Sequence, residues 1–141
     1  MQDHRTETAY WALRITFGVI PIVAGLDKFT NLLTNWEAYL SPIAVRLLPV
    51  SPHAFMMLVG VVEIIVGIGV LSGHARVFGW IAGAWLLGIA LNLLTTGHFL
   101  DVAARDVALA VSAFALAELA PAPERAAVRS AKAPTPAEAH A

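Results

Sequence analysis

The sequence of 141 residues contains no cysteine. Disulfides, thiolate metal ligands, iron–sulfur ligation and thiol nucleophiles are therefore excluded, and redox chemistry would need a partner or a bound cofactor. Charge is also scarce, because Asp, Glu, Lys and Arg make up 13% of the residues and leave a net charge of −1. A basic stripe interleaved with aromatic residues, which nucleic-acid binding requires, is missing as well. We therefore expect no nucleic-acid partner.

Apolar residues, in contrast, make up 58% of the chain, and the mean hydropathy is +0.71. Both values exceed those of typical soluble domains. A membrane-spanning helix needs about 20 largely apolar residues, and four segments come close to that: residues 9–26, 54–71, 77–94 and 102–120. The sequence therefore predicts an all-α membrane protein, with residues 1–120 forming a bundle of four transmembrane helices.

The fourth segment is the least certain of these spans. Arg105 and Asp106 lie near its start, and without that first turn its apolar part is too short to cross a bilayer. A re-entrant or interfacial segment is the alternative. We nevertheless predict a crossing, because an even number of spans agrees with the distribution of basic residues.

Four spans would place five basic residues on one side of the membrane and three on the other. The richer side is expected to be cytoplasmic, so we predict both termini there, in a multi-pass protein of the inner (plasma) membrane. The first span lacks the clear cleavage site of a signal peptide, so we expect it to be retained as a transmembrane helix. The richer side receives Arg5, Arg76, Arg125, Arg129 and Lys132, and the other side receives Lys28, Arg46 and Arg105.

Two segments lie outside the spans. Residues 29–53 are apolar, contain Trp36 and Tyr39, and are interrupted by three prolines. Because Trp and Tyr favour the membrane–water boundary, this segment is predicted to lie along the outer interface. Residues 121–141 are rich in Ala and Pro and cannot bury a core, so they are expected to form a disordered tail.

Polar and small residues recur at helical spacing within every span. In lipid, such residues mark the faces on which helices approach each other. We therefore predict a common interior onto which four polar stripes converge. The stripes contain Arg14, Gly18, Pro21, Gly25 and Lys28 in the first span; Met56, Gly60, Glu63 and Gly67 in the second; Trp85, Gly88, Asn92 and Thr95 in the third; and Asp101, Arg105, Ala108, Ser112 and Ala115 in the fourth.

Two charges lie deep enough in their spans to need a partner. Glu63 is near the middle of the second span, and Arg14 is about a quarter of the way into the first. Since an unpaired carboxylate at that depth is costly, we predict an Arg14–Glu63 pair or a close water-mediated contact. Such a pair would either fix the register of the helices or serve as a protonatable or ligand-binding site.

Further polar residues fall at the outer ends of the spans, where they are predicted to form a cluster. Ordinary snorkelling and helix-end pairing explain such residues equally well. His53 and His98 could in principle ligate a haem or a metal, but no second pair and no HxxxH spacing supports this, and we predict no metal site. The cluster would comprise Asp27, Lys28, Asn92, His98, Asp101, Arg105 and Asp106.

Four stretches of the sequence resemble the DoxX/DoxD-like small membrane proteins. They are LRITFGVIPIVAGLDKF in the first span, LVGVVEIIVGIGVLSG in the second, LNLLTTGH at the end of the third, and ARDVALAVSAFALA in the fourth. The resemblance covers about residues 10–120. It implies a four-helix inner-membrane protein associated with quinone-linked or thiol and sulfur oxidation, and by position it points to Arg14, Lys28, Glu63, Arg105 and Asp106.

Three hypotheses on function follow. The first is an accessory membrane subunit of an oxidoreductase assembly that binds a quinone in the bundle through Trp85, Asn92, His98 and Glu63. The second is a small-solute or proton-coupled transporter with Glu63 as its protonatable site, which would require a homo-oligomer. The third is a non-catalytic anchor that recruits a soluble enzyme. The sequence contains no complete catalytic constellation.

Overall fold

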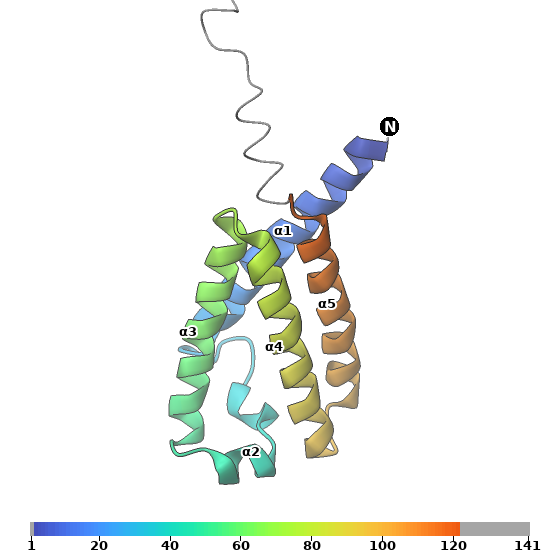
Figure 1. The fold of residues 1–141 in the computed structure, drawn as a ribbon. Coiled ribbons are helices and arrows are strands. Elements are labelled where there is room, and N and C mark those ends of the chain that lie inside the picture. The colour runs from blue at the N-terminus through green and yellow to red at the C-terminus, as the bar shows by residue number, and fades with distance from the viewer. Residues whose placement is uncertain (1, 122–141) are drawn as a thin grey trace, which may run out of the picture.

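A computed structural model describes residues 2–121 and confirms an all-α protein with four main helices (Figure 1). Two short helices lie between the first and second main helices, within the predicted loop. The predicted tail lies, apart from Pro121, outside the described residues. In chain order the helices are α1 (Gln2–Asp27), η1 (Trp36–Tyr39, a 3-10 helix), α2 (Pro42–Leu47), α3 (Pro52–Leu71), α4 (Ala75–Thr96) and α5 (Leu100–Leu119).

Three of these helices are long and apolar enough to cross a membrane: Asp3–Asp27, Pro52–Leu71 and Ala75–Thr96. They indicate a multi-pass membrane protein. Helix α5 has 20 residues, as many as α3, but its four charged residues keep it out of this group. These residues are Asp101, Arg105, Asp106 and Glu118. A fourth crossing therefore stays a prediction.

The four main helices lie side by side, and α1 begins at the end of the bundle at which α5 ends (Figure 1). We call this the terminal end; it includes the turn at residues 72–74. The opposite end, called the loop end, carries residues 28–51 and 97–99. Every main helix exposes large apolar side chains, as expected of surfaces that face lipid. Examples are Ile15, Ile20, Leu58, Ile65, Leu91, Leu94, Val107 and Val111.

Turn chemistry explains where the helices begin and end. Helix α3 starts with Pro52 at its first position, and the side chain of Ser51 accepts a hydrogen bond from the backbone N–H of Ala54. The turns after α3 and α4 place Gly73 and Gly97 at φ values of +97° and +69°. Only glycine adopts that conformation at little cost. These two turns reverse the chain, so α3, α4 and α5 run antiparallel.

Helices α1 and α3 meet through glycines. A Cβ atom on Gly25 would lie 2.5 Å from the carbonyl oxygen of Gly60, and a Cβ atom on Gly67 would lie 2.5 Å from the carbonyl oxygen of Gly18. The two backbones are therefore in direct contact, as in other membrane helix pairs with small residues at the interface. This contact fixes the antiparallel register and confirms that the predicted glycine stripes of the first two spans face each other.

This close approach is testable with one added methyl group. We expect Gly25→Ala to lower the free energy of unfolding by roughly 1–3 kcal/mol, because the new Cβ forces α1 and α3 apart. Gly88→Ala is the matched control, since nothing lies within 4 Å of a Cβ atom at that position. Thermal unfolding followed by circular dichroism in detergent should separate the two variants. Equal stability of both would contradict the register described above.

Candidate functional site

The centre of the candidate site is an ion pair between Lys28, which directly follows the last residue of α1, and Glu63 in the middle of α3. The Nζ atom of Lys28 lies 2.6 Å from the Oε2 atom of Glu63. The two side chains are only 3% and 12% exposed. Breaking such a buried pair leaves an uncompensated charge, which costs far more than losing a surface pair.

Helix geometry explains why these two residues meet. Gly25 is opposite Gly60, so the Cα atom of Lys28 lies about 9 Å, or less than two helical turns, beyond the level of Glu63, towards the loop end. Side chains in a helix lean towards its N-terminus. Because α1 and α3 are antiparallel, the side chain of Lys28 leans towards Glu63 and that of Glu63 leans towards Lys28. The lengths of the two side chains bridge the remaining distance between the backbones of Lys28 and Glu63.

The segment after α1 folds over this ion pair. The Nζ atom of Lys28 lies 3.7 Å from the centre of the Trp36 ring, a favourable cation–π distance. The indole N–H of Trp36 donates a hydrogen bond of 2.8 Å to Asp27. Asp27 also accepts hydrogen bonds from the backbone N–H groups of Leu32 and Leu33. Asp27 therefore shapes the loop, and Lys28 holds Trp36 against the bundle.

Trp36 was not among the site residues predicted from the sequence, where it was assigned only to the outer interfacial segment. Its side chain stabilises both charged neighbours, Asp27 through its N–H group and Lys28 through its ring. Lys28 follows the end of α1 and Trp36 begins η1, so no single helix contains both residues and only the folded loop brings them together.

A second carboxylate lies near the pair. Asp106 of α5 is buried and close enough to Glu63 for the two charges to interact. Within the described part of the chain, the one cation within 4 Å of Asp106 is Arg105, whose Nε atom is 3.7 Å away. The side chain of Arg105 is 66% exposed. Asp106 is therefore a buried acid whose partner is weak. That partner, the neighbouring Arg105, is exposed at the protein surface.

The predicted Arg14–Glu63 pair is wrong. The Nε and Nη2 atoms of Arg14 donate hydrogen bonds to the carbonyl oxygens of Val70 and Leu71, at 3.1 and 2.7 Å. The α1–α3 register places Arg14 opposite the end of α3, about 12 Å along the helix from Glu63. Arg14 instead satisfies carbonyl groups that the helix end leaves without partners.

Asn92 has a structural role at the loop end. Its side-chain oxygen accepts a hydrogen bond from the backbone N–H of Ser41, and its amide group donates one to the carbonyl oxygen of Tyr39. Both functional groups of Asn92 are thus engaged with the loop. The ring of Tyr39 also packs on that of Phe99, with centroids 4.7 Å apart. These contacts fix the loop between α3 and α4.

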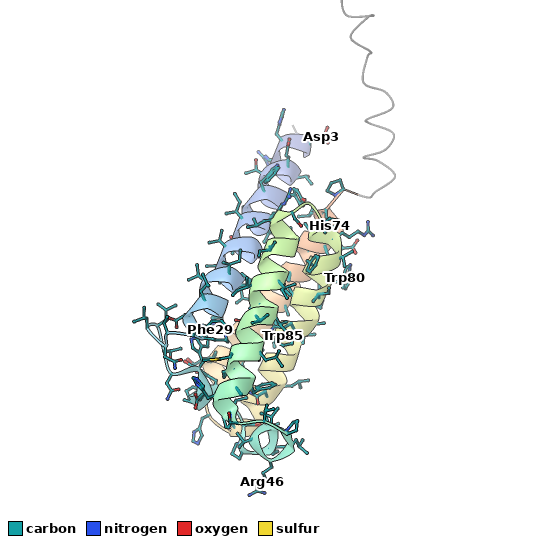
Figure 2. The ribbon with its side chains drawn as sticks, turned by 90° about the vertical axis from the view of Figure 1, so that its left-hand side faces the viewer. Asp3, Phe29, Arg46, His74, Trp80 and Trp85 are labelled. Atoms are coloured by element: carbon teal, nitrogen blue, oxygen red, sulfur yellow. The ribbon has the colours of Figure 1, made fainter. Side chains whose placement is uncertain are left out.

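The remaining predicted residues are spread over the molecule. His98 and Asp101 are exposed at the loop end, and His53 pairs with the exposed Glu37 at 2.8 Å. Trp85 lies on α4 between the terminal and loop ends, as its position between His74 and Arg46 shows (Figure 2). The structure therefore brings together Lys28, Glu63 and Asp106, with Asp27 and Arg105 next to them, whereas Asn92, His98 and Asp101 have separate surroundings.

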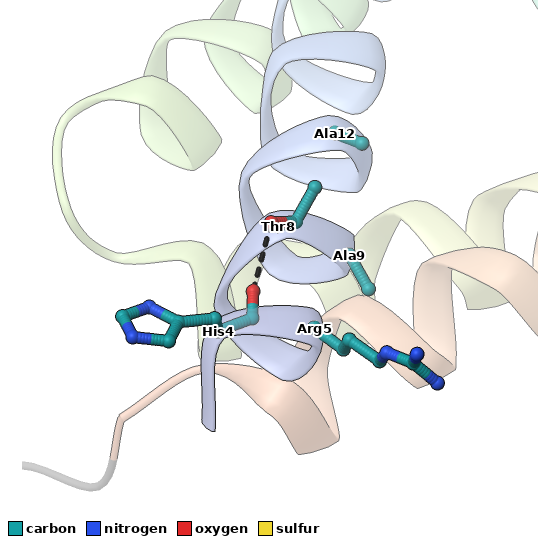
Figure 3. A pocket seen from close by; sticks show the side chains of 5 residues that line it. All are labelled: His4, Arg5, Thr8, Ala9 and Ala12. Atoms are coloured by element: carbon teal, nitrogen blue, oxygen red, sulfur yellow. Dashed lines mark hydrogen bonds between the residues drawn. The ribbon is translucent and has the colours of Figure 1, made fainter. Parts of the chain in front are cut away.

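A shallow surface depression of about 390 Å³ lies elsewhere, on the first turns of α1 (Figure 3). A single helix lines it, and its one internal hydrogen bond joins the hydroxyl of Thr8 to the carbonyl oxygen of His4. Arg5 contributes the charged group of this lining. Along α1 it is more than about 20 Å from Lys28, so it is separate from the buried ion pair.

Comparisons of the chain with protein-family models, with curated proteins and with solved structures gave no match.

The buried pair can be tested by a double-mutant cycle. We expect Lys28→Met and Glu63→Leu each to lower the free energy of unfolding by about 3–5 kcal/mol, since each leaves one buried charge alone. The double variant should lose much less, because no charge is then left unpaired. Denaturant unfolding in mixed micelles measures all three. Glu37→Gln, which removes an exposed pair, should cost under about 1 kcal/mol; strictly additive effects of the two core substitutions would argue against the pair.

Proposed function

We propose that this chain is an accessory membrane subunit of a quinone-linked oxidoreductase assembly, as its resemblance to the DoxX/DoxD-like proteins implies. The observation that carries the proposal is the group of Lys28, Glu63 and Asp106 inside a bundle whose core is mainly apolar. Ionisable groups at such a position are costly, and they usually mark ligand sites or proton pathways in membrane proteins. A site of this kind suits a quinone, which is apolar but exchanges protons.

The chemistry needs protons inside the membrane. A quinone that accepts two electrons also takes up two protons to become a quinol. Asp106 is suited to pass protons to such a ligand, because it is buried, weakly paired and adjacent to the exposed Arg105. The Lys28–Glu63 pair holds a fixed positive and negative charge beside it.

The electrons would come from a partner subunit. The oxidation of two thiols to a disulfide releases two electrons and two protons, which balances the reduction of one quinone to a quinol. Because the chain has no cysteine, thiol or sulfur oxidation would take place on that partner. The proposed role of this chain is to bind the quinone and deliver protons to it.

Within this proposal α5 is a fourth crossing, and both ends of the bundle domain face the cytoplasm. Helix α5 is long enough for this, since 20 residues rise about 30 Å. It exposes Val107 and Val111 in the direction of lipid. The start of α1 and the end of α5 lie at the same end of the bundle (Figure 1), as an even number of crossings requires.

Purification from the native membrane in mild detergent tests the assembly directly. We expect bound quinone in the lipid extract and a redox protein that co-purifies with the chain. Solute flux in proteoliposomes made from the chain alone, or a co-purifying enzyme without any quinone, would support the transporter or the anchor instead.

The proton role is tested with two aspartates of the same helix. In the purified assembly, Asp106→Asn should reduce the turnover number for quinone reduction by roughly a hundredfold, which is typical for the loss of a general acid, while the bound quinone is retained. Asp101→Asn is the matched control, because Asp101 is exposed. Unchanged turnover in Asp106→Asn would remove Asp106 from the mechanism.

A further inference from the structure

Trp85 of α4 carries a hydrogen-bond donor that the protein itself does not use. Among the buried side-chain nitrogen and oxygen atoms of residues 3–121, the indole Nε1 of Trp85 is the one atom without a hydrogen-bond partner. Buried Trp N–H groups normally find an acceptor. In a membrane protein a bare donor is especially costly, because the surrounding hydrocarbon offers none.

The neighbours of Trp85 on its helix show which way this face is turned. Phe78, Trp85 and Asn92 are spaced by seven residues and therefore share one stripe of α4. Phe78 packs at Gly69 of α3, and Asn92 binds the loop at Tyr39. Trp85 is midway between these two contacts. Its stripe therefore faces the region between α3 and the loop.

Helices α3 and α4 meet at the turn of residues 72–74 and diverge towards the loop end (Figure 1), where η1 contacts α3 and α2 contacts α4. Trp85 lies on the diverging part of α4, about halfway between His74 and Arg46 (Figure 2).

Trp85 is also level with the charged group. Because Gly69 is opposite Phe78 in the antiparallel α3–α4 pair, Trp85 is opposite the residue before Glu63. The donor and the buried carboxylate therefore lie at the same depth, on helices that face each other.

The chemistry of the donor defines its ligand. An indole N–H donates but cannot accept a hydrogen bond, so the ligand must present an acceptor atom, such as a carbonyl oxygen. It must also be apolar enough to enter from lipid, and a flat ligand would gain further by packing on the indole ring. Two membrane-soluble sources offer such an oxygen: the carbonyl group of a quinone ring and the ester carbonyl of a phospholipid.

We infer that the N–H group of Trp85 donates a hydrogen bond to the ring carbonyl of a quinone bound between α3 and α4. This inference rests on the proposed function and deepens it, since it names the residue that orients the ligand. The flat ring would lie beside the indole, at the depth of Glu63.

Binding of a short-chain benzoquinone to the protein in nanodiscs, measured by calorimetry, tests the inference. Trp85→Phe keeps an aromatic ring but removes the donor, and it should raise the Kd about tenfold, the usual effect of losing one such hydrogen bond. Trp80→Phe is the matched control, because the exposed Trp80 packs on Phe114 and lies on another face of α4. An equal Kd for the wild type and Trp85→Phe would overturn the inference and leave the proposed function standing, whereas no binding to the wild type would overturn both.

A second measurement needs no variant and therefore tests the inference even if the Trp85→Phe protein does not fold. In the wild-type protein with ¹⁵N-labelled tryptophan, one indole N–H resonance should shift when the benzoquinone is added, both in ester-linked and in ether-linked phospholipids. A resonance that differs between the two lipids and ignores the benzoquinone would assign the acceptor to the phospholipid ester and overturn the inference.

Discussion

The ammonium group of Lys28 and the carboxylate of Glu63 are the two charges around which this bundle is organised. They can lie 2.6 Å apart only because Gly25 and Gly60 allow the backbones of α1 and α3 to touch. That contact fixes the register of the two helices. The same lysine holds Trp36, and through it the loop, against the bundle. Burial of one ion pair thus links helix packing, register and loop conformation.

Much of this architecture follows from the sequence. The long apolar runs predict the main helices, and the spacing of Gly18, Gly25, Gly60 and Gly67 predicts a close pair of helices. The partner of Glu63 could not be chosen correctly, because a stripe gives the face of a helix but not its axial register against a neighbour. Depth alone favoured Arg14, whereas backbone contact selects Lys28.

The contacts of the loop were beyond prediction for a different reason. Asn92 fits an inward polar stripe, yet it bonds to backbone groups of Tyr39 and Ser41 that are more than 50 positions away in the sequence. Trp36 reaches Lys28 through an irregular segment with no period. Hydrophobic periodicity identifies the faces of helices. It therefore cannot identify residues whose contacts depend on the conformation of a loop.

The polar groups of the bundle divide into two kinds. Those that the fold itself uses are satisfied: Arg14 binds carbonyl groups at the end of α3, and Asn92 and Asp27 hold the loop. Two groups are not satisfied in this way. The carboxylate of Asp106 has only a weak ion-pair partner, and the indole N–H of Trp85 has no hydrogen-bond acceptor. One is suited to supply a proton and the other to orient a carbonyl oxygen. A quinone needs both.

The most direct test of this account is photolabelling of the purified protein in nanodiscs with an azido-benzoquinone, followed by mass spectrometry of the peptides. The account predicts adducts on the facing segments of α3 and α4, around residues 59–66 and 82–89, and competition by unlabelled benzoquinone. Adducts confined to the lipid-facing residues of α1 and α5, or labelling that unlabelled benzoquinone does not reduce, would contradict it.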